Sequence, residues 1–200
     1  MMSTEATRAE PVRRNGRARA RLLEAAARLF YADGIAATGI DSITAEAGVA
    51  KMSLYNNFTS KADLVAAYLD ARHEEWLQLY TRRAASASTP AEAIDAVFDA
   101  YIDHASLAYL HGFRGCGLLN AAAELPASDP GRAVVRRHKE DVEEILRTQL
   151  RLLVPEARAE ATAQHLSFLL EGSMARAGLD GDQRKLLAAQ GIARALVAAL

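Results

Sequence analysis

The chain has 200 residues, of which 50% are hydrophobic and 24% charged, and its net charge is −1 at pH 7. These values are ordinary for a globular protein of one or two domains and argue against a disordered or fibrous chain. No stretch approaches the roughly 20 apolar residues of a membrane span, and no apolar signal segment follows the N-terminus. The single cysteine, Cys116, excludes an intrachain disulfide. We therefore expect a soluble, cytoplasmic protein.

The charges are distributed unevenly along the chain. Residues 1–61 hold nine Arg and Lys against six Asp and Glu, whereas the remaining residues hold fifteen against nineteen. Seven of the nine cations are arginines between Arg8 and Arg28. This pattern indicates an anionic partner for the N-terminal part alone, although a solvated helix face would give the same charges. We expect residues 1–16 to form a flexible basic arm.

The predicted fold is all-α, with about nine helices. Alanine, leucine, arginine and glutamate dominate, and no window alternates with a period of two. The first helix is expected at about residues 17–32, and the "DG" at 33–34 ends it.

A second helix is expected to begin near Thr38. The pattern "TGID" is typical of a capping box, with Thr38 as the N-cap and Asp41 reaching back, and Gly48 suits the C-terminal end. A short third helix over "SLYNNF" (53–58) follows almost at once.

Six further helices are expected in the rest of the chain. Ser60 opens a cap pattern, "SKAD", Pro90 suits the start of a helix, and Pro155 ends one. Three glycines in "HGFRGCG" and two in "GLDGD" interrupt the helical pattern. These signals predict helices at about residues 61–84, 90–109, 116–125, 132–153, 156–177 and 183–199.

Two short helices joined at "AGVAK" match a helix-turn-helix, whose second helix enters the major groove of DNA. The side chains of that second helix suit the task. Lys51 can pair with phosphate or guanine, Ser53 can bond the DNA backbone or a base, and Tyr55 offers a hydroxyl to phosphate. Asn56 and Asn57 carry the amide group that pairs bidentately with adenine.

Residues 17–66 resemble the DNA-binding domain of the TetR family of transcriptional regulators. The resemblance is carried by "ARLLEAAARLFYADG", "TGIDSITAEAGV" and "LYNNFTSKADL", all in register. It implies a three-helix DNA-binding domain at 17–63 and a helical ligand-binding and dimerisation bundle at 64–200. It also implies that Thr38, Tyr55 and Lys61 contact phosphate. The place of Lys61 at the start of a helix favours an anion independently, and simple solvation is the alternative.

The chain departs from the family pattern at three places. Ala50 stands where many members have a serine or threonine that caps the recognition helix, and alanine forfeits about 0.5–2 kcal/mol of capping free energy. Met52 replaces a small residue, and either contacts a thymine methyl group or shields the backbone. "NN" stands where histidine or tyrosine often occurs. The operator sequence therefore cannot be taken from a relative.

The resemblance further implies that the last two helices form a dimer interface. The segments "ATAQHLSFLLEGSMARAG" and "KLLAAQGIARALVAAL" are apolar on more than one face, so those faces must be covered. A symmetric partner would cover them, and an ordinary intrachain core is the alternative. We expect a homodimer, with Leu166 and Leu196 in its interface.

An inducer pocket is also implied, and its candidate residues are large or polar groups on predicted inward faces. Aromatic residues at helical spacing fit a plain core equally well, whereas a buried His104 or Asn120 would need a partner. Cys116 lies near Arg114 at the start of a helix, so it is either a reactive thiol of an electrophile or oxidant sensor or a small buried filler. The candidate ligand contacts are Trp76, Tyr80, Phe98, Tyr101, His104, Phe113, Cys116, Asn120 and Phe168.

Nothing in the sequence indicates catalysis, a metal site or a cofactor. The five histidines include no pair at i and i+4, and no nucleophile or phosphate-loop motif is present. We predict a dimeric repressor that a small-molecule inducer releases from a palindromic DNA operator. The alternative, favoured only by Ala50 and Met52, is a helical small-molecule or thiol-based sensor whose DNA target is altered or lost.

Overall fold

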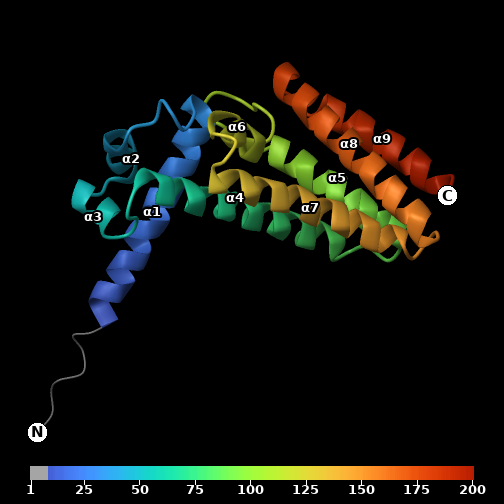
Figure 1. Cartoon of the computed structure of the whole chain (residues 1–200), viewed down its shortest axis with the longest axis horizontal. Helices are drawn as coiled ribbons and strands as arrows, with labels where there is room; N and C mark the ends of the chain where they lie inside the picture. The colour runs from blue at the N-terminus through green and yellow to red at the C-terminus, as the bar shows by residue number, and fades with distance from the viewer. Residues whose placement is uncertain (1–8) are drawn as a thin grey trace, which may run out of the picture. The chain divides into compact units, whose positions relative to one another are not determined.

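The computed structural model describes residues 9–200, and the side chains of residues 16–200 (Figure 1). In this part of the chain the regular structure consists of nine helices, which confirms the all-α prediction. None of the helices described is both long and apolar enough to cross a membrane. The chain divides into two compact units, Met1–Asp70 and Ala71–Leu200. The boundary falls at Asp70, inside α4 (Lys61–Ala84), rather than at residue 63.

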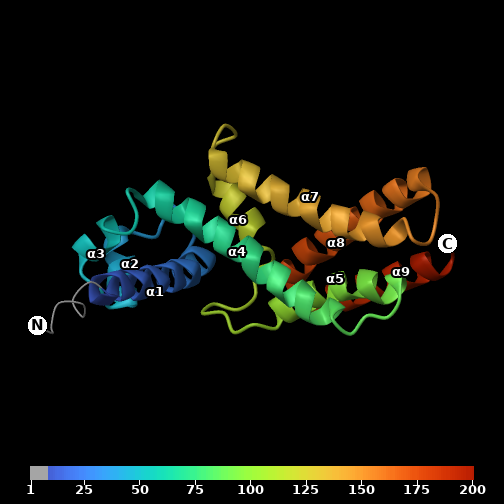
Figure 2. The ribbon, with the colours of Figure 1, turned by 90° about the horizontal axis from the view of Figure 1, so that it is seen from below.

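The first unit is built from α1 (Ala9–Asp33), α2 (Ile40–Ala47), α3 (Lys51–Tyr55) and the first turns of α4. α1 begins before residue 17, so residues 9–16 of the expected arm are helical, and residues 1–8 lie outside the described part. α1 contacts both α2 and α3, which also contact each other (Figure 2). A single apolar core joins them, and its fully or almost fully buried side chains include Leu22, Ala26, Phe30, Ile43, Leu54, Phe58, Leu64 and Tyr68.

The second unit contains the rest of α4 together with α5 (Pro90–Ala105), α6 (Gly117–Glu124), α7 (Pro130–Leu150), α8 (Glu156–Asp180) and α9 (Arg184–Ala198). α5 and α8 each contact both α7 and α9, so these four helices form a closed bundle. α8 and α9 lie side by side (Figure 1). The bundle core includes Val97, Phe98, Tyr101, Leu146, Leu150, Leu166, Leu170, Met174 and Leu186.

Local hydrogen bonds set several helix ends, and not all of these lie where the sequence predicts. α5 begins at Pro90 as predicted, after a complete capping box between Thr89 and Glu92. α7 begins at Pro130 because the carboxylate of Asp129 accepts a bond of 2.8 Å from the Gly131 amide. α8 continues to Asp180, where Gly181 adopts a left-handed conformation (φ 72°) that ends the helix.

α8 passes very close to the glycine-rich loop that precedes α6. A Cβ atom on Gly178 would lie 2.6 Å from the Gly115 nitrogen and 2.8 Å from the Arg114 carbonyl carbon. Gly115 itself has a φ of 83°, which favours glycine. The glycines that interrupt the helical pattern therefore allow the backbone approach that seats Cys116 at the start of α6.

Candidate nucleic-acid interface

The start of α2 differs from the predicted capping box. Its N-cap is Gly39, with no side-chain cap, so the prediction for Thr38 and Asp41 was wrong. Thr38 is buried, and its hydroxyl donates a bond of 2.6 Å to the Gly34 carbonyl. A hydroxyl has one proton to donate. In this arrangement the Thr38 side chain closes the loop between α1 and α2 and has no proton left for a phosphate.

The turn between α2 and α3 depends on Gly48, as the sequence predicts. Its φ of 58° and ψ of 43° are left-handed, and its amide donates a bond of 3.0 Å to the Ala45 carbonyl. A left-handed conformation at a helix end costs little free energy for glycine and more for other residues. Arg21 of α1 donates to the Gly48 carbonyl at 3.1 Å. The turn is therefore fixed to α1 as well as to α2.

α3 is a short helix held from behind by two apolar anchors. It ends at Tyr55, so Asn56 is its C-cap and Asn57 and Phe58 lie beyond it, unlike the predicted helix over 53–58. Leu54 and Phe58 are buried, and the guanidinium of Arg19 lies 5.1 Å from the centre of the Phe58 ring. The anchors leave the other side of α3 facing solvent.

The exposed side of α3 presents polar, aromatic and apolar groups together. Lys51, Met52, Tyr55 and Asn56 are exposed, and the exposed fractions of Met52 (68%) and Tyr55 (49%) are unusually large for such side chains. This surface combines a cation, a hydroxyl, an amide and a methyl-bearing chain. These are the groups that contact phosphates, adenine edges and thymine methyl groups.

The two asparagines, which the sequence leaves equivalent, differ in the structure. Asn57 is partly buried, and its side-chain amide donates a bond of 2.7 Å to the Ser53 carbonyl. Asn56 is exposed. One donor of Asn57 therefore stabilises the end of α3, and Asn56 is the better candidate for a bidentate contact with a base.

Both lysines near α3 are positioned by partners within the unit. The Lys51 ammonium lies 2.8 Å from the Asp41 carboxylate, and the hydrogen bond and charge of Asp41 raise the pKa of Lys51. Lys61 donates a bond of 2.5 Å to the Ile35 carbonyl. An ammonium has three donors, so each lysine keeps protons for a phosphate.

The first turn of α4 is capped as "SKAD" predicts. The Ser60 hydroxyl accepts a bond of 3.1 Å from the Asp63 amide, and the Asp63 carboxylate accepts one of 2.8 Å from the Thr59 amide. Lys61 is thereby the first residue of α4, beside the partial positive charge of the helix N-terminus. This position supports the predicted phosphate contact of Lys61.

The N-cap of α3 is an alanine in an extended conformation (φ −67°, ψ 149°) without a side-chain cap. Serine adopts this conformation readily and accepts a bond from the first turn. We expect Ala50→Ser to raise the free energy of unfolding by about 0.5–2 kcal/mol, measured by urea titration. Ala45→Ser, on the exposed side of α2, is the matched control and should be neutral or slightly destabilising. Equal effects from both changes would contradict the capping argument.

Part of the predicted ligand set forms one cluster in the second unit. Trp76 stacks on Tyr80 with ring centres 5.8 Å apart, and it lies 5.3 Å from Tyr101. Trp76 also meets His138, which the sequence analysis did not select. Burial, and then the charge of Lys139, lower the pKa of His138 to about 3, so this imidazole is neutral.

Lys139, also missed from the sequence, connects the cluster to Cys116. Its ammonium lies 2.8 Å from the Glu171 carboxylate, 3.4 Å from the Tyr101 hydroxyl and 3.6 Å from the Cys116 sulfur. Burial alone lowers the pKa of Lys139, but Cys116, Tyr101 and Glu171 outweigh it and raise the pKa. The indole nitrogen of Trp76 and one carboxylate oxygen of Glu171 are buried, and neither has a hydrogen-bond partner among the residues that the structure describes.

The other predicted ligand residues lie elsewhere. His104 bonds to Tyr109, and Asn120 donates a bond of 3.0 Å to the Arg114 carbonyl, so both stabilise the loop before α6. Phe113 is buried beside Tyr109, and Phe98 lies in the bundle core. Phe168 was wrongly assigned to an inward face, because its side chain is 65% exposed.

α8 and α9 carry an exposed face that is mostly apolar. On α8 the exposed residues of this face recur at steps of three and four, as on one side of a helix. They are Ala161, His165, Phe168, Gly172, Ala175 and Leu179. On α9 the exposed set includes Leu187, Gly191, Ile192 and Ala195. Leu166 is fully buried within the chain and Leu196 is half-buried, so the choice of Leu166 as an interface residue was wrong.

Comparisons with known proteins agree with this architecture. Residues 22–68 match the family model described as bacterial regulatory proteins of the tetR family. The HTH-type transcriptional regulator TtgR of Pseudomonas putida is 46% identical over 56 residues, which cover 28% of this chain and 27% of TtgR. The HTH-type transcriptional activator FasR of Mycolicibacterium smegmatis is 38% identical over 96 residues, or 46% of this chain and 43% of FasR. The chain thus matches less than half the length of these curated relatives.

Solved structures match over nearly the whole chain. A TetR-family transcriptional regulator of Streptomyces coelicolor is 33% identical, with a TM-score of 0.82 over 92% of this chain and 95% of that one. A TetR transcriptional regulator of Chloroflexus aurantiacus is 26% identical, with a TM-score of 0.81 over 93% and 96%. The similarity therefore extends through both units.

Proposed function

We propose that this chain, which belongs to the TetR family of bacterial transcriptional regulators, is a homodimeric repressor that a small molecule releases from a palindromic operator. The observation that carries the proposal is the outer surface of α3. Lys51, Met52, Tyr55 and Asn56 are exposed there while Leu54 holds the helix in place. A recognition helix needs this division between anchored and exposed sides.

The homodimer is supported by the exposed apolar face of α8 and α9. Large side chains such as Phe168 and Ile192 alternate there with Gly172 and Gly191. Apart from its own helix backbone, an added Cβ at either glycine would have no atom of the described residues within 4 Å. Small residues next to large ones let two helices approach closely. A second copy, related to the first by a two-fold axis, would bury this face. Two-fold symmetry of the dimer matches a palindromic operator.

The inducer is proposed to bind among Trp76, Tyr101, Lys139 and Glu171. The unpartnered indole N–H of Trp76 requires an acceptor, and the unpartnered Glu171 oxygen requires a donor. A ligand with a ring and both kinds of polar group would satisfy them. Such a ligand releases DNA only if its affinity differs between the DNA-bound and free arrangements of the dimer. The role is one of binding, without catalysis.

The experiment that tests this function is a titration of the full chain with the DNA that flanks its own coding region. We expect an inverted repeat in that DNA to bind at least about 1,000-fold more tightly than a scrambled duplex at physiological salt. Equal affinity for both duplexes would contradict the repressor proposal. It would favour the alternative of a helical sensor without a DNA target.

A further inference from the structure

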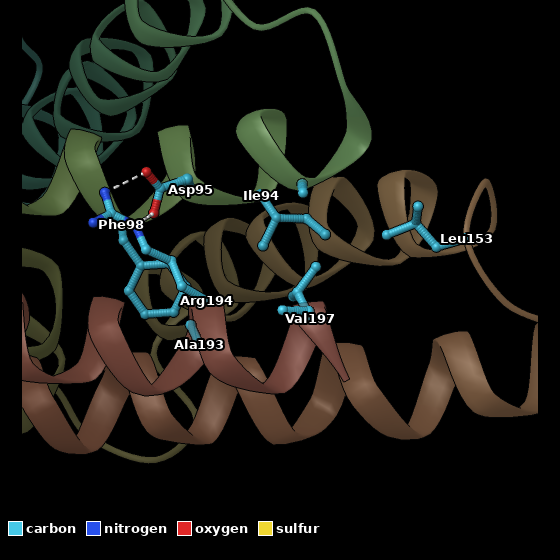
Figure 3. Close-up of a pocket in the computed structure, with 9 residues that line it drawn as sticks. Ile94, Asp95, Phe98, Leu153, Ala193, Arg194 and Val197 are labelled. Carbon is cyan, nitrogen blue, oxygen red and sulfur yellow. Dashed lines mark hydrogen bonds and ion pairs between the residues drawn. The ribbon is translucent and has the colours of Figure 1, made fainter. Parts of the chain in front are cut away.

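A pocket of about 220 Å³ lies between α5 and α9 in the second unit (Figure 3). Its walls are mainly apolar and contain none of the residues of the Trp76–Lys139 cluster. Figure 3 shows Asp95 and Arg194 at one side of the pocket and Leu153 at the other. The apolar wall is formed by Ile94, Phe98, Leu153, Ala193 and Val197.

The pocket continues a seam of polar pairs that join α5 to α9. The Gln190 side chain donates a bond of 2.7 Å to the Asp99 carboxylate. Four residues later on α9 and four residues earlier on α5, Arg194 donates to the two oxygens of Asp95 at 2.8 and 2.6 Å. Because residues four apart lie on the same side of a helix, successive pairs follow one line along the seam.

The third position of the seam holds two alanines. Ala91 comes four residues before Asp95 on α5, and Ala198 comes four residues after Arg194 on α9, and both line the pocket. Both are exposed to solvent. Since their side chains end at Cβ, they leave open the space that longer side chains fill at the first two positions. The pocket therefore has a definite cause in the sequence and an opening at this end.

The size and lining of the pocket indicate the chemistry of an occupant. A dry cavity of about 150 Å³ lined by aliphatic and aromatic side chains binds benzene, so this pocket has room for one ring with a small substituent. The Asp95–Arg194 pair is neutral overall, so it supplies no net charge that would offset the desolvation of an added carboxylate or ammonium in a mainly apolar pocket. Arg194 uses two of its five N–H groups on Asp95, which leaves donors for a hydroxyl or carbonyl oxygen.

We infer that the pocket at the α5–α9 seam is a second small-molecule site, separate from the proposed inducer cluster. It takes a neutral compound with one aromatic ring or a short alkyl chain, whose hydroxyl or carbonyl group lies at Arg194. Ala193 and Val197 line the pocket, while Ile192 and Ala195 lie on the exposed face of the same helix. An occupant would thus pack against the inner side of the helix that we propose for dimerisation.

The test uses benzyl alcohol as the probe and the full chain labelled with ¹³C in the methyl groups of Ile, Leu and Val. We expect the methyl resonances of Ile94, Leu153 and Val197 to shift and to saturate with a Kd of about 1 mM or lower. Benzoate and benzylamine should bind at least about tenfold more weakly because each adds an unpaired charge.

Two variants close the pocket from its exposed end. Ala91→Leu and Ala198→Leu should each abolish the saturable shifts. Each should also raise the melting temperature by about 2–4 °C, because the new side chain fills apolar space. Ala123→Leu, at an exposed alanine of α6 outside the pocket, is the matched control and should bind the probe like the parent chain.

Three results would overturn the inference. The first is that the methyl resonances of Ile94, Leu153 and Val197 do not shift, or that their shifts still rise linearly with benzyl alcohol concentration at about 20 mM. The second is undiminished binding in both Ala91→Leu and Ala198→Leu. The third is loss of binding in Ala123→Leu as well, which would show that the shifts report a general change in the unit.

Discussion

A chain carrying Ile192→Asp will sediment as a monomer and will bind operator DNA at least about 100-fold more weakly than the parent chain. Ile192 is 53% exposed on α9, on the mostly apolar face shared with Phe168 of α8. A buried, unpaired carboxylate in the proposed two-fold interface would cost more than the interface can offset. A monomer then loses the second half-site and the gain that comes from two linked contacts.

The matched control for this variant is Leu110→Asp. Leu110 is 58% exposed in the same unit but lies in the loop between α5 and α6, on neither α8 nor α9. We expect this variant to remain dimeric and to bind operator normally. An Ile192→Asp chain that keeps its helical content and still sediments as a dimer would contradict the proposed interface.

Asn56→Ala will weaken binding to the operator by about 1–3 kcal/mol and will barely change binding to a scrambled duplex. The Asn56 amide is exposed at the end of α3, and a bidentate contact of asparagine with adenine has this magnitude. Fluorescence titrations of both duplexes at several salt concentrations measure the two effects. A loss of the same factor on both duplexes would mean that Asn56 does not read a base.

Three further variants serve as comparisons for Asn56→Ala. Lys61→Ala should weaken binding to both duplexes and flatten the slope of log affinity against log salt by about one unit, because one fewer counterion is released. Tyr55→Phe should weaken binding to both duplexes by the same factor, because the predicted contact of the Tyr55 hydroxyl is with phosphate. Asn57→Ala should lower stability, because it removes the bond to the Ser53 carbonyl.

The sequence predicts the helices well and their ends less well. The helix ends at Gly48 and Ser60 were predicted correctly, because each requires a specific conformation or hydrogen bond that few residues supply. The predicted cap at Thr38 was wrong because a hydroxyl near a helix start can bond forward to the helix or back to the preceding loop. The pattern "TGID" fits both arrangements. In the structure the Thr38 hydroxyl bonds to the Gly34 carbonyl. This bond depends on how the loop between α1 and α2 folds back over α1, which the sequence pattern does not give.

The residues of the ligand-binding unit are harder to predict for a physical reason. α8 is apolar on more than one face, so its periodicity does not tell which face packs inside the chain. Leu166 and Phe168 were assigned to the wrong sides for this reason. Lys139 was missed because lysine is rarely buried. Its partner Glu171 is distant in the sequence, and only the folded bundle brings them within 2.8 Å.

The most direct test of the central claim is selection of binding sites by the full chain from a pool of random DNA duplexes. If α3 reads DNA as part of a two-fold dimer, the selected duplexes will share an inverted repeat. Its half-sites will be centred about 10–10.5 base pairs, or a multiple of this, apart. Repeating the selection with Asn56→Ala should relax one base position in each half-site. Selected duplexes that share no sequence, with affinity that depends on salt alone, would contradict the claim that the surface of α3 is a reading surface.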